Sequence, residues 1–237
     1  KPMRTPEFWR AGQRGLAGTA LSPLGALYGA ASILRQRMAH PSRIGIPVIC
    51  VGNIVAGGAG KTPTALALAL ALKAKGMKPH FLTRGYGGRL AGPVRVDLAK
   101  HDAAAVGDEA LLLARKAPTW VARNRVAGGR AAEAAGADII VMDDGHQNPH
   151  LTKDLSIVVV DGGFGFGSGR LFPAGPLREP IARGLARATA VVVIGADTTG
   201  THDALRTLPL PVIDAELLPG MEAYEIGERA VVAFAGI

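Results

Sequence analysis

Short apolar runs alternate with longer stretches of helical character along the chain from residue 46 onward. Runs such as "IPVICVG" and "ADIIVMD" are continuously apolar, which is typical of strands that are covered on both faces. The stretches "TPTALALALALKAKG" and "DEALLLARKA" lie between such runs and favour helices. The predicted strands are Val48–Gly52, His80–Thr83, Thr119–Ala122, Ile139–Asp143, Leu155–Asp161, Ala190–Ile194, Val212–Ala215 and Ala230–Phe234. This order predicts an α/β fold with a doubly wound, mostly parallel sheet.

The N-terminal segment has a different pattern. Residues 15–34 carry no charge, but glycines, Pro23 and several hydroxyl groups leave them too weakly apolar to predict a transmembrane helix. We expect two helices that begin at Thr5-Pro6-Glu7 and at Ser22-Pro23, because an N-cap followed by proline is a start signal. Apolar residues recur at helical spacing and arginines flank them: Leu16, Leu24, Leu27, Ala31 and Leu34, with Arg10, Arg14, Arg35, Arg37 and Arg43. This pattern fits amphipathic helices that lie on anionic lipid and, equally well, helices packed on their own domain.

A glycine-rich stretch, "VGNIVAGGAGKTPT", follows the first predicted strand. The strand ends at Gly52 and a helix is expected to open at Thr62, so backbone N–H groups and the helix N-terminus converge on one anion site. Val55 occupies the place of the first glycine in the strict G-x-x-x-x-G-K-T pattern, so the match is to the looser G-G-x-G-K-T form. Lys61 is expected to reach the β- and γ-phosphates of ATP, and the Thr62 hydroxyl to bind Mg²⁺. The candidate nucleotide-binding residues are Val55, Ala56, Gly57, Gly58, Ala59, Gly60, Lys61 and Thr62.

Acidic residues follow two further predicted elements. The strand in "ADIIVMDDGHQN" ends in Asp143 and Asp144, where a P-loop fold places the carboxylate that orients Mg²⁺. In "VGDEALLLA", Asp108 and Glu109 stand at a helix start, which either reflects favourable capping or provides a carboxylate that accepts a hydroxyl proton. The candidate metal ligands are Thr62, Asp143 and Glu109, and the candidate catalytic residues are Asp108, Lys61 and Asp144.

Basic clusters and one long turn-rich segment complete the candidate site. The clusters are "TRGYGGR", "ARNR" and "GPLREP", and the last of them lies in the turn-rich segment 161–180. Arginines that follow strand ends lie on the ligand-binding edge of such a sheet. The candidate substrate contacts are Arg84, Tyr86, Arg125, Gln147 and Arg178.

Charge and cysteine content narrow the classes of function. The chain has 27 Lys and Arg against 19 Asp and Glu, a formal net charge of +8, but aromatic residues make up only 5%. The scarcity of aromatic side chains argues against a nucleic-acid-binding protein with stacking platforms, and a basic face towards anionic phosphates or lipids fits better. Cys50 is the single cysteine, which excludes an internal disulfide and a cysteine-based metal site and makes the cytoplasm the default compartment.

Five stretches together resemble a known family. "VGNIVAGGAGKTP", "TRGYGG", "VGDEA", "DDGHQN" and "FPAGPLRE", in this order, look like the tetraacyldisaccharide 4'-kinases, the lipid A biosynthesis kinases of Gram-negative bacteria. The resemblance implies membrane-interface helices at residues 1–45 and a P-loop kinase domain at residues 46–237. It implies transfer of the γ-phosphoryl group of ATP, with Mg²⁺, to the 4'-hydroxyl of a tetraacyldisaccharide 1-phosphate. The enzyme would be peripheral at the anionic, cytoplasmic face of the inner membrane.

The same resemblance implies roles for individual residues. Asp108 would be the general base, Lys61 and Thr62 would contact phosphate and Mg²⁺, and Asp143 and Asp144 would form the acidic pair on the metal side. The chain departs from the family at "DDGHQN", where the family often has histidine in place of Asn148 and an aromatic or aliphatic residue in place of His146. Similar proteins continue beyond "AVVAFAGI", so we expect the family's C-terminal part to be missing.

Two other functions fit the P-loop. One is a switch or partitioning ATPase, in which hydrolysis controls partner binding and the N-terminal helices only target the membrane. The other is a biosynthetic kinase that acts on a small soluble acceptor. ATP hydrolysis without any lipid acceptor would distinguish the switch protein from the lipid kinase.

Overall fold

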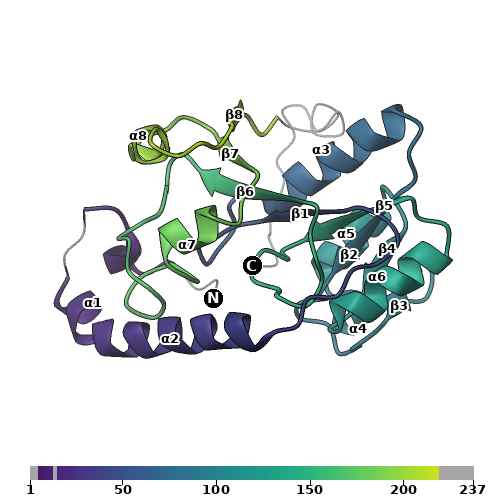
Figure 1. The fold of residues 1–237 in the computed structure, drawn as a ribbon, viewed down its shortest axis with the longest axis horizontal. Coiled ribbons are helices and arrows are strands. Elements are labelled where there is room, and N and C mark those ends of the chain that lie inside the picture. The colour runs from purple at the N-terminus through teal and green to yellow at the C-terminus, as the bar shows by residue number, and fades with distance from the viewer. Residues whose placement is uncertain (1–4, 13–14, 219–237) are drawn as a thin grey trace, which may run out of the picture.

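The computed structural model describes residues 5–12 and 15–218, in which an eight-stranded sheet is covered by helices (Figure 1). The strands are β1 Val48–Gly52, β2 Pro79–Thr83, β3 Val94–Arg95, β4 Thr119–Val121, β5 Ile139–Asp143, β6 Leu155–Asp161, β7 Ala190–Ile194 and β8 Val212–Ala215. The helices are η1 Glu7–Trp9, α1 Leu16–Ala20, α2 Ser22–Met38, α3 Lys61–Ala74, α4 Ala103–Val106, α5 Asp108–Ala114, α6 Arg125–Ala134, α7 Ile181–Leu185 and α8 Thr201–Leu205.

The sheet has the strand order β3-β4-β2-β5-β1-β6-β7-β8. Among the described residues, neighbouring strands are parallel except at β3, which pairs antiparallel with β4. This confirms the predicted doubly wound, mostly parallel sheet. β1 lies between β5 and β6, so the chain passes to one side of β1 and then to the other. In such sheets, ligands bind in the crevice beyond the carboxyl end of the strand at the switch point, which is where the glycine-rich stretch begins.

Each predicted strand in the described part of the chain is present, with one-residue differences at the bounds of β2 and β4. The predicted strand at 230–234 lies outside the described residues. β3 was not predicted, because two residues at a sheet edge leave no apolar run to detect.

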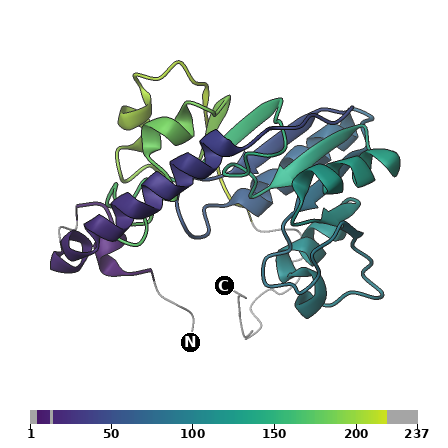
Figure 2. The same ribbon diagram turned by 60° about the horizontal axis from the view of Figure 1, so that its bottom comes forward.

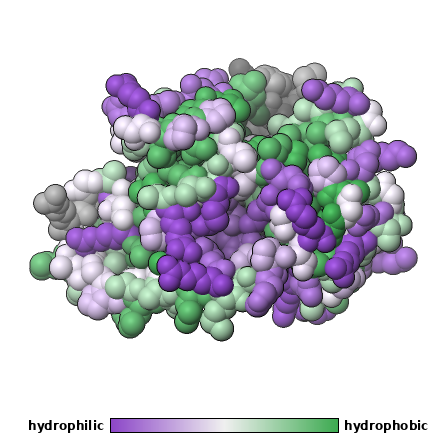
Figure 3. Space-filling model, in the orientation of Figure 1, coloured by the Kyte–Doolittle hydropathy of each residue, from purple (hydrophilic) through white to green (hydrophobic). Residues whose placement is uncertain are grey.

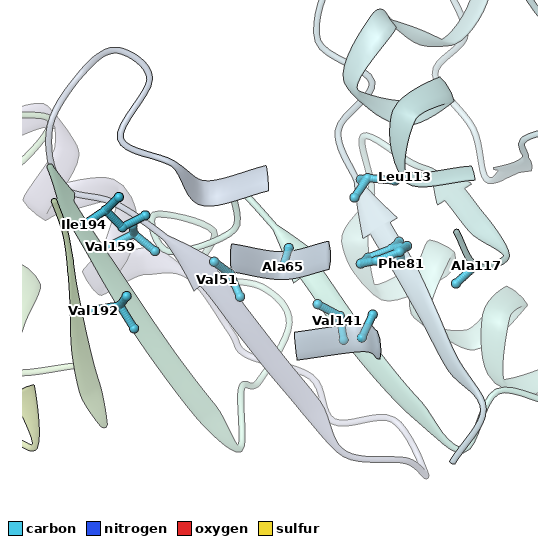
Figure 4. Packing of buried hydrophobic residues seen from close by; sticks show 10 residues of the cluster. Val51, Ala65, Phe81, Leu113, Ala117, Val141, Val159, Val192 and Ile194 are labelled. Carbon is cyan, nitrogen blue, oxygen red and sulfur yellow. The ribbon is translucent and has the colours of Figure 1, made fainter. Parts of the chain in front are cut away.

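The core has two layers, one on each face of the sheet. On one face, Val51 and Val141 pack against Ala65 of α3, together with side chains from α5 (Figure 4). On the opposite face, Leu185 of α7 and Ala132 of α6 lie in the clusters that cover the strands. Burial on both faces explains why β1, β2 and β5 are buried at every position.

Helix α2 begins at Ser22, as predicted, but the other details of the N-terminal helix starts differ from the prediction. The start signal at Thr5-Pro6-Glu7 leads only to the short 3-10 turn η1, and α2 does not begin with a capping serine. Leu21, which precedes α2, is already helical, so α1 runs almost directly into α2. The Ser22 hydroxyl donates to the Gly18 carbonyl at 2.9 Å instead of capping, because an N-cap needs extended backbone.

Helix α2 packs on the body of the protein through glycines rather than leucines. Gly25 and Gly29 are buried, and a Cβ atom on Gly29 would lie 2.6 Å from Leu171 Cδ1. By contrast, Leu24 is 53% exposed and Leu27 is 67% exposed. Of the two alternatives for the leucine row, packing on the protein's own domain is therefore wrong, because close approach selects the small-residue face.

The leucine row of α2 instead faces outward. Figure 1 and Figure 2 show α2 as a long helix along one edge of the molecule, and Figure 3 shows apolar side chains along that edge. Leu16 and Leu34 are also exposed, whereas the flanking Arg14 lies outside the described residues. Within the described part of the chain, no helix has both the length and the hydropathy needed to cross a bilayer.

His202 links α8 to β8, and its contacts predict that the stability of the fold depends on pH. His202 Nδ1 lies 2.9 Å from Asp197 Oδ2, and Nε2 lies 2.8 Å from Asp214 Oδ1. Hydrogen bonding to Asp197, and then to Asp214, raises the pKa of His202. Protonated His202 therefore stabilises the folded state. This contribution to the free energy of unfolding is complete below the ordinary histidine pKa of about 6.5 and is lost as the pH rises through the raised pKa. We expect His202→Gln to lower the unfolding temperature more at about pH 6 than at about pH 9. Equal losses at both pH values would show that charge on His202 does not contribute.

Candidate active site

The glycine-rich loop joins the centre of the sheet to α3. Gly57 and Gly60 have φ angles of 118° and 79°, values that favour glycine, and a Cβ on Gly60 would overlap Ile194 Cδ1. Asn53 is buried and its side-chain amide donates to the Gly57 carbonyl at 3.3 Å. The helix begins at Lys61, one residue earlier than predicted, with its N-terminus directed at the loop. This is the arrangement of an anion site built from backbone N–H groups.

The first residues of the loop, Val55 and Ala56, contact the turn-rich segment. The Ala56 N–H donates to the Pro176 carbonyl at 2.7 Å, and Val55 pairs with Leu177 across an isolated bridge. Among the predicted nucleotide-binding residues, Val55 and Ala56 therefore fix the loop against the turn-rich segment. A pocket of about 390 Å³ opens beside the following residues, Gly58 to Gly60.

Lys61 carries a cation at the mouth of the loop. Its Nζ donates to the Gly57 carbonyl at 3.2 Å and is exposed to solvent. A lysine held across a glycine loop by a single carbonyl can exchange that contact for a phosphate oxygen, which makes a stronger, charge-assisted hydrogen bond.

Thr62 and Asp143 form a pair of oxygen donors next to the loop. The Thr62 hydroxyl donates to Asp143 Oδ2 at 3.1 Å, while Asp143 Oδ1 is buried without a hydrogen-bond partner among the described residues. Burial, followed by the charge of Glu109, raises the pKa of Asp143 to about 7. A buried carboxylate with an unused oxygen beside a hydroxyl fits Mg²⁺, which binds few protein oxygens and keeps water and phosphate as its other ligands.

The described residues contain no cluster of three or more His, Cys, Asp or Glu side chains that could hold a metal ion by themselves. A metal cage made entirely of protein side chains is therefore absent from this part of the chain. The Thr62 and Asp143 pair fits an ion that is shared with a bound nucleotide.

Asp144, the second acidic residue, is paired with an arginine from the turn-rich segment. Its φ angle of 51° is in the left-handed region, and Arg178 Nη1 donates to its Oδ1 at 2.8 Å. Gln147 donates to the Asn53 carbonyl at 2.7 Å and to Glu179 Oε1 at 3.0 Å. These contacts bring three of the predicted residues, Asp144, Gln147 and Arg178, to the edge of the sheet next to the loop.

Glu179 was missed by the sequence analysis. It is 1% exposed, and Arg187 Nη2 donates to both of its carboxylate oxygens, at 2.8 and 2.7 Å. Burial alone would raise the pKa of Glu179, but the hydrogen bonds and charge of Arg187 and the hydrogen bond from Gln147 lower it. The sequence pattern singled out the neighbouring Arg178 but not Glu179. An acidic residue before a proline in a turn-rich segment gives no indication that it is buried.

The start of α5 faces the acidic pair. Glu109 is exposed, but partial desolvation raises its pKa, the charges of Asp144 and Asp108 raise it further, and Lys61 and Arg178 lower it. These electrostatic couplings indicate that Glu109 lies near the loop lysine and the acidic pair, and its role as a metal ligand stays a prediction. Asp108 caps its own helix start by accepting the Glu109 N–H at 2.9 Å and is exposed. Its role as a general base stays a prediction.

The basic clusters differ in how accessible they are. Tyr86 is 82% exposed and Arg84 is also exposed, whereas Arg125 is buried and donates to the Ala122 carbonyl. Burial, followed by the nearby charge of Arg84, lowers the pKa of Arg125 to about 10. Its Nε atom is buried without a partner in the described structure. Arg84 and Arg125 are close enough to influence each other, and Tyr86 extends into solvent.

The side chain of His146 is buried beneath α7, and both of its ring nitrogens have polar partners. Its Nε2 lies 2.9 Å from the Gly184 carbonyl and its Nδ1 lies 2.9 Å from the Ser156 hydroxyl. Because a carbonyl only accepts, Nε2 carries the proton and Nδ1 accepts from Ser156. Burial, followed by the charge of Arg187, lowers the pKa of His146 to about 4. The ring is therefore neutral at physiological pH and ties α7 to the sheet.

Comparisons with known proteins agree with this geometry. The family profile described as Tetraacyldisaccharide-1-P 4'-kinase matches residues 17–237. The curated tetraacyldisaccharide 4'-kinases of Rhodospirillum rubrum and Paramagnetospirillum magneticum are each 57% identical over 99% of this chain, which spans 71% and 72% of theirs. A crystal structure of the "apo" form of LpxK from Aquifex aeolicus in complex with ATP has a TM-score of 0.68 and 26% identity, over 84% of this chain and 64% of that one. The chain thus belongs to the tetraacyldisaccharide-1-P 4'-kinase family.

Proposed function

We propose that the protein transfers the γ-phosphoryl group of ATP to the 4'-hydroxyl of a tetraacyldisaccharide 1-phosphate, a step of lipid A biosynthesis. The observation that carries this proposal is the gathering of a P-loop lysine, a hydroxyl–carboxylate pair and an arginine–carboxylate pair at the carboxyl edge of the sheet. The names of the curated relatives, and the ATP in the solved relative, support the substrate and the phosphoryl donor.

The residues around the loop bind and orient the phosphates. Backbone N–H groups from Gly57 to Thr62 would hold the phosphate oxygens, and Lys61 would exchange the Gly57 carbonyl for them. Thr62 and Asp143 would hold Mg²⁺, with Glu109 nearby. When bound, Mg²⁺ neutralises charge on the β- and γ-phosphates. Because this reaction depends on positioning and charge neutralisation, these groups supply most of what it needs.

Asp108 is the proposed general base. The 4'-oxygen attacks the γ-phosphorus, the bond from that phosphorus to the bridging oxygen of ADP breaks, and the hydroxyl proton passes to the Asp108 carboxylate. The support is its place at the α5 N-terminus, next to Glu109, whose charge is coupled to Lys61 and Asp144. Asp144 would act by positioning Arg178, whose Nη1 donates to Asp144 Oδ1 at 2.8 Å. Arg84 and Tyr86, which are exposed, are proposed acceptor contacts at the same edge, whereas the predicted contact by Arg125 is not supported because its side chain is buried.

The outward leucines of α2 support a peripheral position on the membrane. We place residues 1–45 at the anionic, cytoplasmic face of the inner membrane, with residues 46–237 as the kinase domain. Leu24, Leu27 and Leu34 would enter the lipid, while Arg35 and Arg37 at the end of α2 would contact anionic headgroups. This position would bring the enzyme to the acyl chains of its acceptor.

Charge on the α2 leucine row is expected to release the protein from membranes. We expect the Leu24→Asp/Leu27→Asp double variant to lose most of its binding to anionic vesicles in a sedimentation assay, because charged groups oppose burial in lipid. Both side chains are more than half exposed, so the unfolding temperature should hardly change. Leu70→Asp is the matched control, since Leu70 on α3 is 51% exposed and lies off the α2 surface. If the double variant unfolds and the wild type never sediments with vesicles, α2 is not a membrane contact.

A comparison of ATP consumption with and without the acceptor tests the proposal against its rivals. A lipid kinase should consume ATP slowly alone and much faster with tetraacyldisaccharide 1-phosphate. A switch or partitioning ATPase would hydrolyse ATP at the same rate in both cases. A kinase with a soluble acceptor would remain slow in both cases, and each of these results would contradict the proposal.

A further inference from the structure

A second cavity lies away from the glycine-rich loop, between the C-terminal end of α2, α7 and the segment 146–154. Its volume is about 370 Å³. Apolar side chains form part of its lining, and the polar and cationic residues among the rest include Gln36, Lys153, Arg183, Arg187, Asn148 and Thr189. Figure 1 and Figure 2 both show α7 beside α2. Phosphoryl transfer as proposed above makes no use of this cavity.

Two guanidinium groups converge on one neutral atom in this cavity. Arg183 Nε donates to Gln36 Oε1 at 3.2 Å, and Arg187 Nη1 donates to the same oxygen at 3.4 Å. Lys153 Nζ donates to the carbonyls of His146 and Asn148, at 3.0 and 2.7 Å. Among the described residues, neither Arg183 nor Lys153 has a carboxylate within ion-pair distance. Arg183 and Lys153 are thus hydrogen-bonded only to amide oxygens, whereas Arg187 is also paired with Glu179.

The carboxylates next to the cavity are already engaged. Glu179 is held by Arg187, and Asp154 is held by Arg43 at 3.0 Å and by the Val48 N–H at 2.8 Å. The positive charge around the cavity also acts on the pKa of Lys153. Burial lowers the pKa of Lys153, and the charge of Arg187 lowers it further. An anion in the cavity would relieve this repulsion, whereas water relieves it only in part.

We propose that this cavity is a binding site for a phosphate group, held by Arg183, Arg187 and Lys153. Guanidinium groups suit phosphate because they donate in a planar fork, and an ammonium group adds a compact charge. The exposed side chains of Leu34 and Met38 flank Gln36 along α2, so a phospholipid headgroup is one source of the phosphate and free phosphate is the other. The site does not depend on which reaction the P-loop catalyses.

Thermal unfolding with inorganic phosphate tests the site. The P-loop is first saturated with a non-hydrolysable ATP analogue and Mg²⁺, and phosphate is compared with chloride at equal ionic strength. We expect phosphate to raise the unfolding temperature of the wild type, and Arg183→Gln to need about tenfold more phosphate for the same rise, because a charge-assisted contact is lost. Arg115→Gln, which removes an exposed charge at the end of α5, on the other face of the sheet, should respond like the wild type.

A second variant keeps the test decisive even if Arg183→Gln is unstable. Gln36→Glu puts a carboxylate where the two guanidinium groups converge, so it should imitate the bound anion. We expect it to unfold at a higher temperature than the wild type without phosphate and to lose the response to phosphate. A lower unfolding temperature with an intact phosphate response would contradict the proposal.

Vesicles identify the source of the phosphate. If the ligand is a headgroup, Arg183→Gln should bind phosphatidylglycerol vesicles more weakly than Arg115→Gln does, and neither variant should bind phosphatidylcholine vesicles. If it is free phosphate, only the thermal response should depend on Arg183. A wild type that shows neither response, or equal losses in the two arginine variants in both assays, would overturn the proposal in favour of diffuse surface charge.

Discussion

Replacement of Lys61 by alanine is expected to abolish phosphoryl transfer while the unfolding temperature stays unchanged. The Lys61 ammonium is exposed and its protein contact is the Gly57 carbonyl at 3.2 Å, so the fold depends little on it. In the proposed reaction it stabilises charge on the β- and γ-phosphates, and the loss of one such group lowers turnover by roughly a hundredfold or more. The measurement is turnover with the lipid acceptor, accompanied by a thermal unfolding curve.

Lys75→Ala provides the matched control for Lys61. It removes a lysine that follows the C-terminal end of the same helix, α3, and is exposed. We expect this variant to keep full activity. Normal turnover in Lys61→Ala, with unchanged stability, would refute the P-loop assignment rather than only the role of one side chain.

Asp108→Asn is expected to lower turnover by roughly a hundredfold or more with little change in ATP affinity, because a general base contributes about that much. Asparagine keeps the size of aspartate and can still accept the Glu109 N–H, which Asp108 Oδ1 accepts at 2.9 Å. The substitution therefore removes the proton acceptor and spares the helix start. Turnover and the dissociation constant of ATP, measured on the same preparation, separate the two effects.

Glu109→Gln distinguishes the base from its neighbour. Glu109 is coupled to Asp143, Asp144 and Lys61, so its loss should weaken Mg²⁺-dependent ATP binding. If Asp108→Asn works at a near-normal rate, Asp108 is only a helix cap. If both variants lose ATP binding equally, the two carboxylates serve the metal side together and the base lies elsewhere.

The sheet was largely predictable from the sequence for a physical reason. Strands that are buried on both faces must be almost continuously apolar, so β1, β5 and β7 appear in the sequence as apolar runs. The same logic fails for β3, whose two edge residues carry no such pattern. Local signals also located the glycine loop, because a Gly-Lys-Thr stretch after a buried strand has few other uses.

Contacts between distant segments were less predictable. Gly25 and Gly29 form the packing face of α2, whereas the sequence pattern left open whether the leucine row packs on the domain or lies on lipid. Glu179 is buried because Arg187 and Gln147 surround it, and neither partner is marked by a motif. Such pairings depend on how loops return to the sheet, which hydrophobic periodicity does not encode.

The transfer of one phosphate to the lipid is the most direct test of the central claim. The protein is incubated with ATP, Mg²⁺ and a tetraacyldisaccharide 1-phosphate, and the lipid is then analysed by mass spectrometry with fragmentation of the two sugars. The account predicts a lipid heavier by one phosphate, located at the 4' position, in the wild type but not in Lys61→Ala. An unchanged lipid, with ATP consumed equally in its presence and absence, would contradict it.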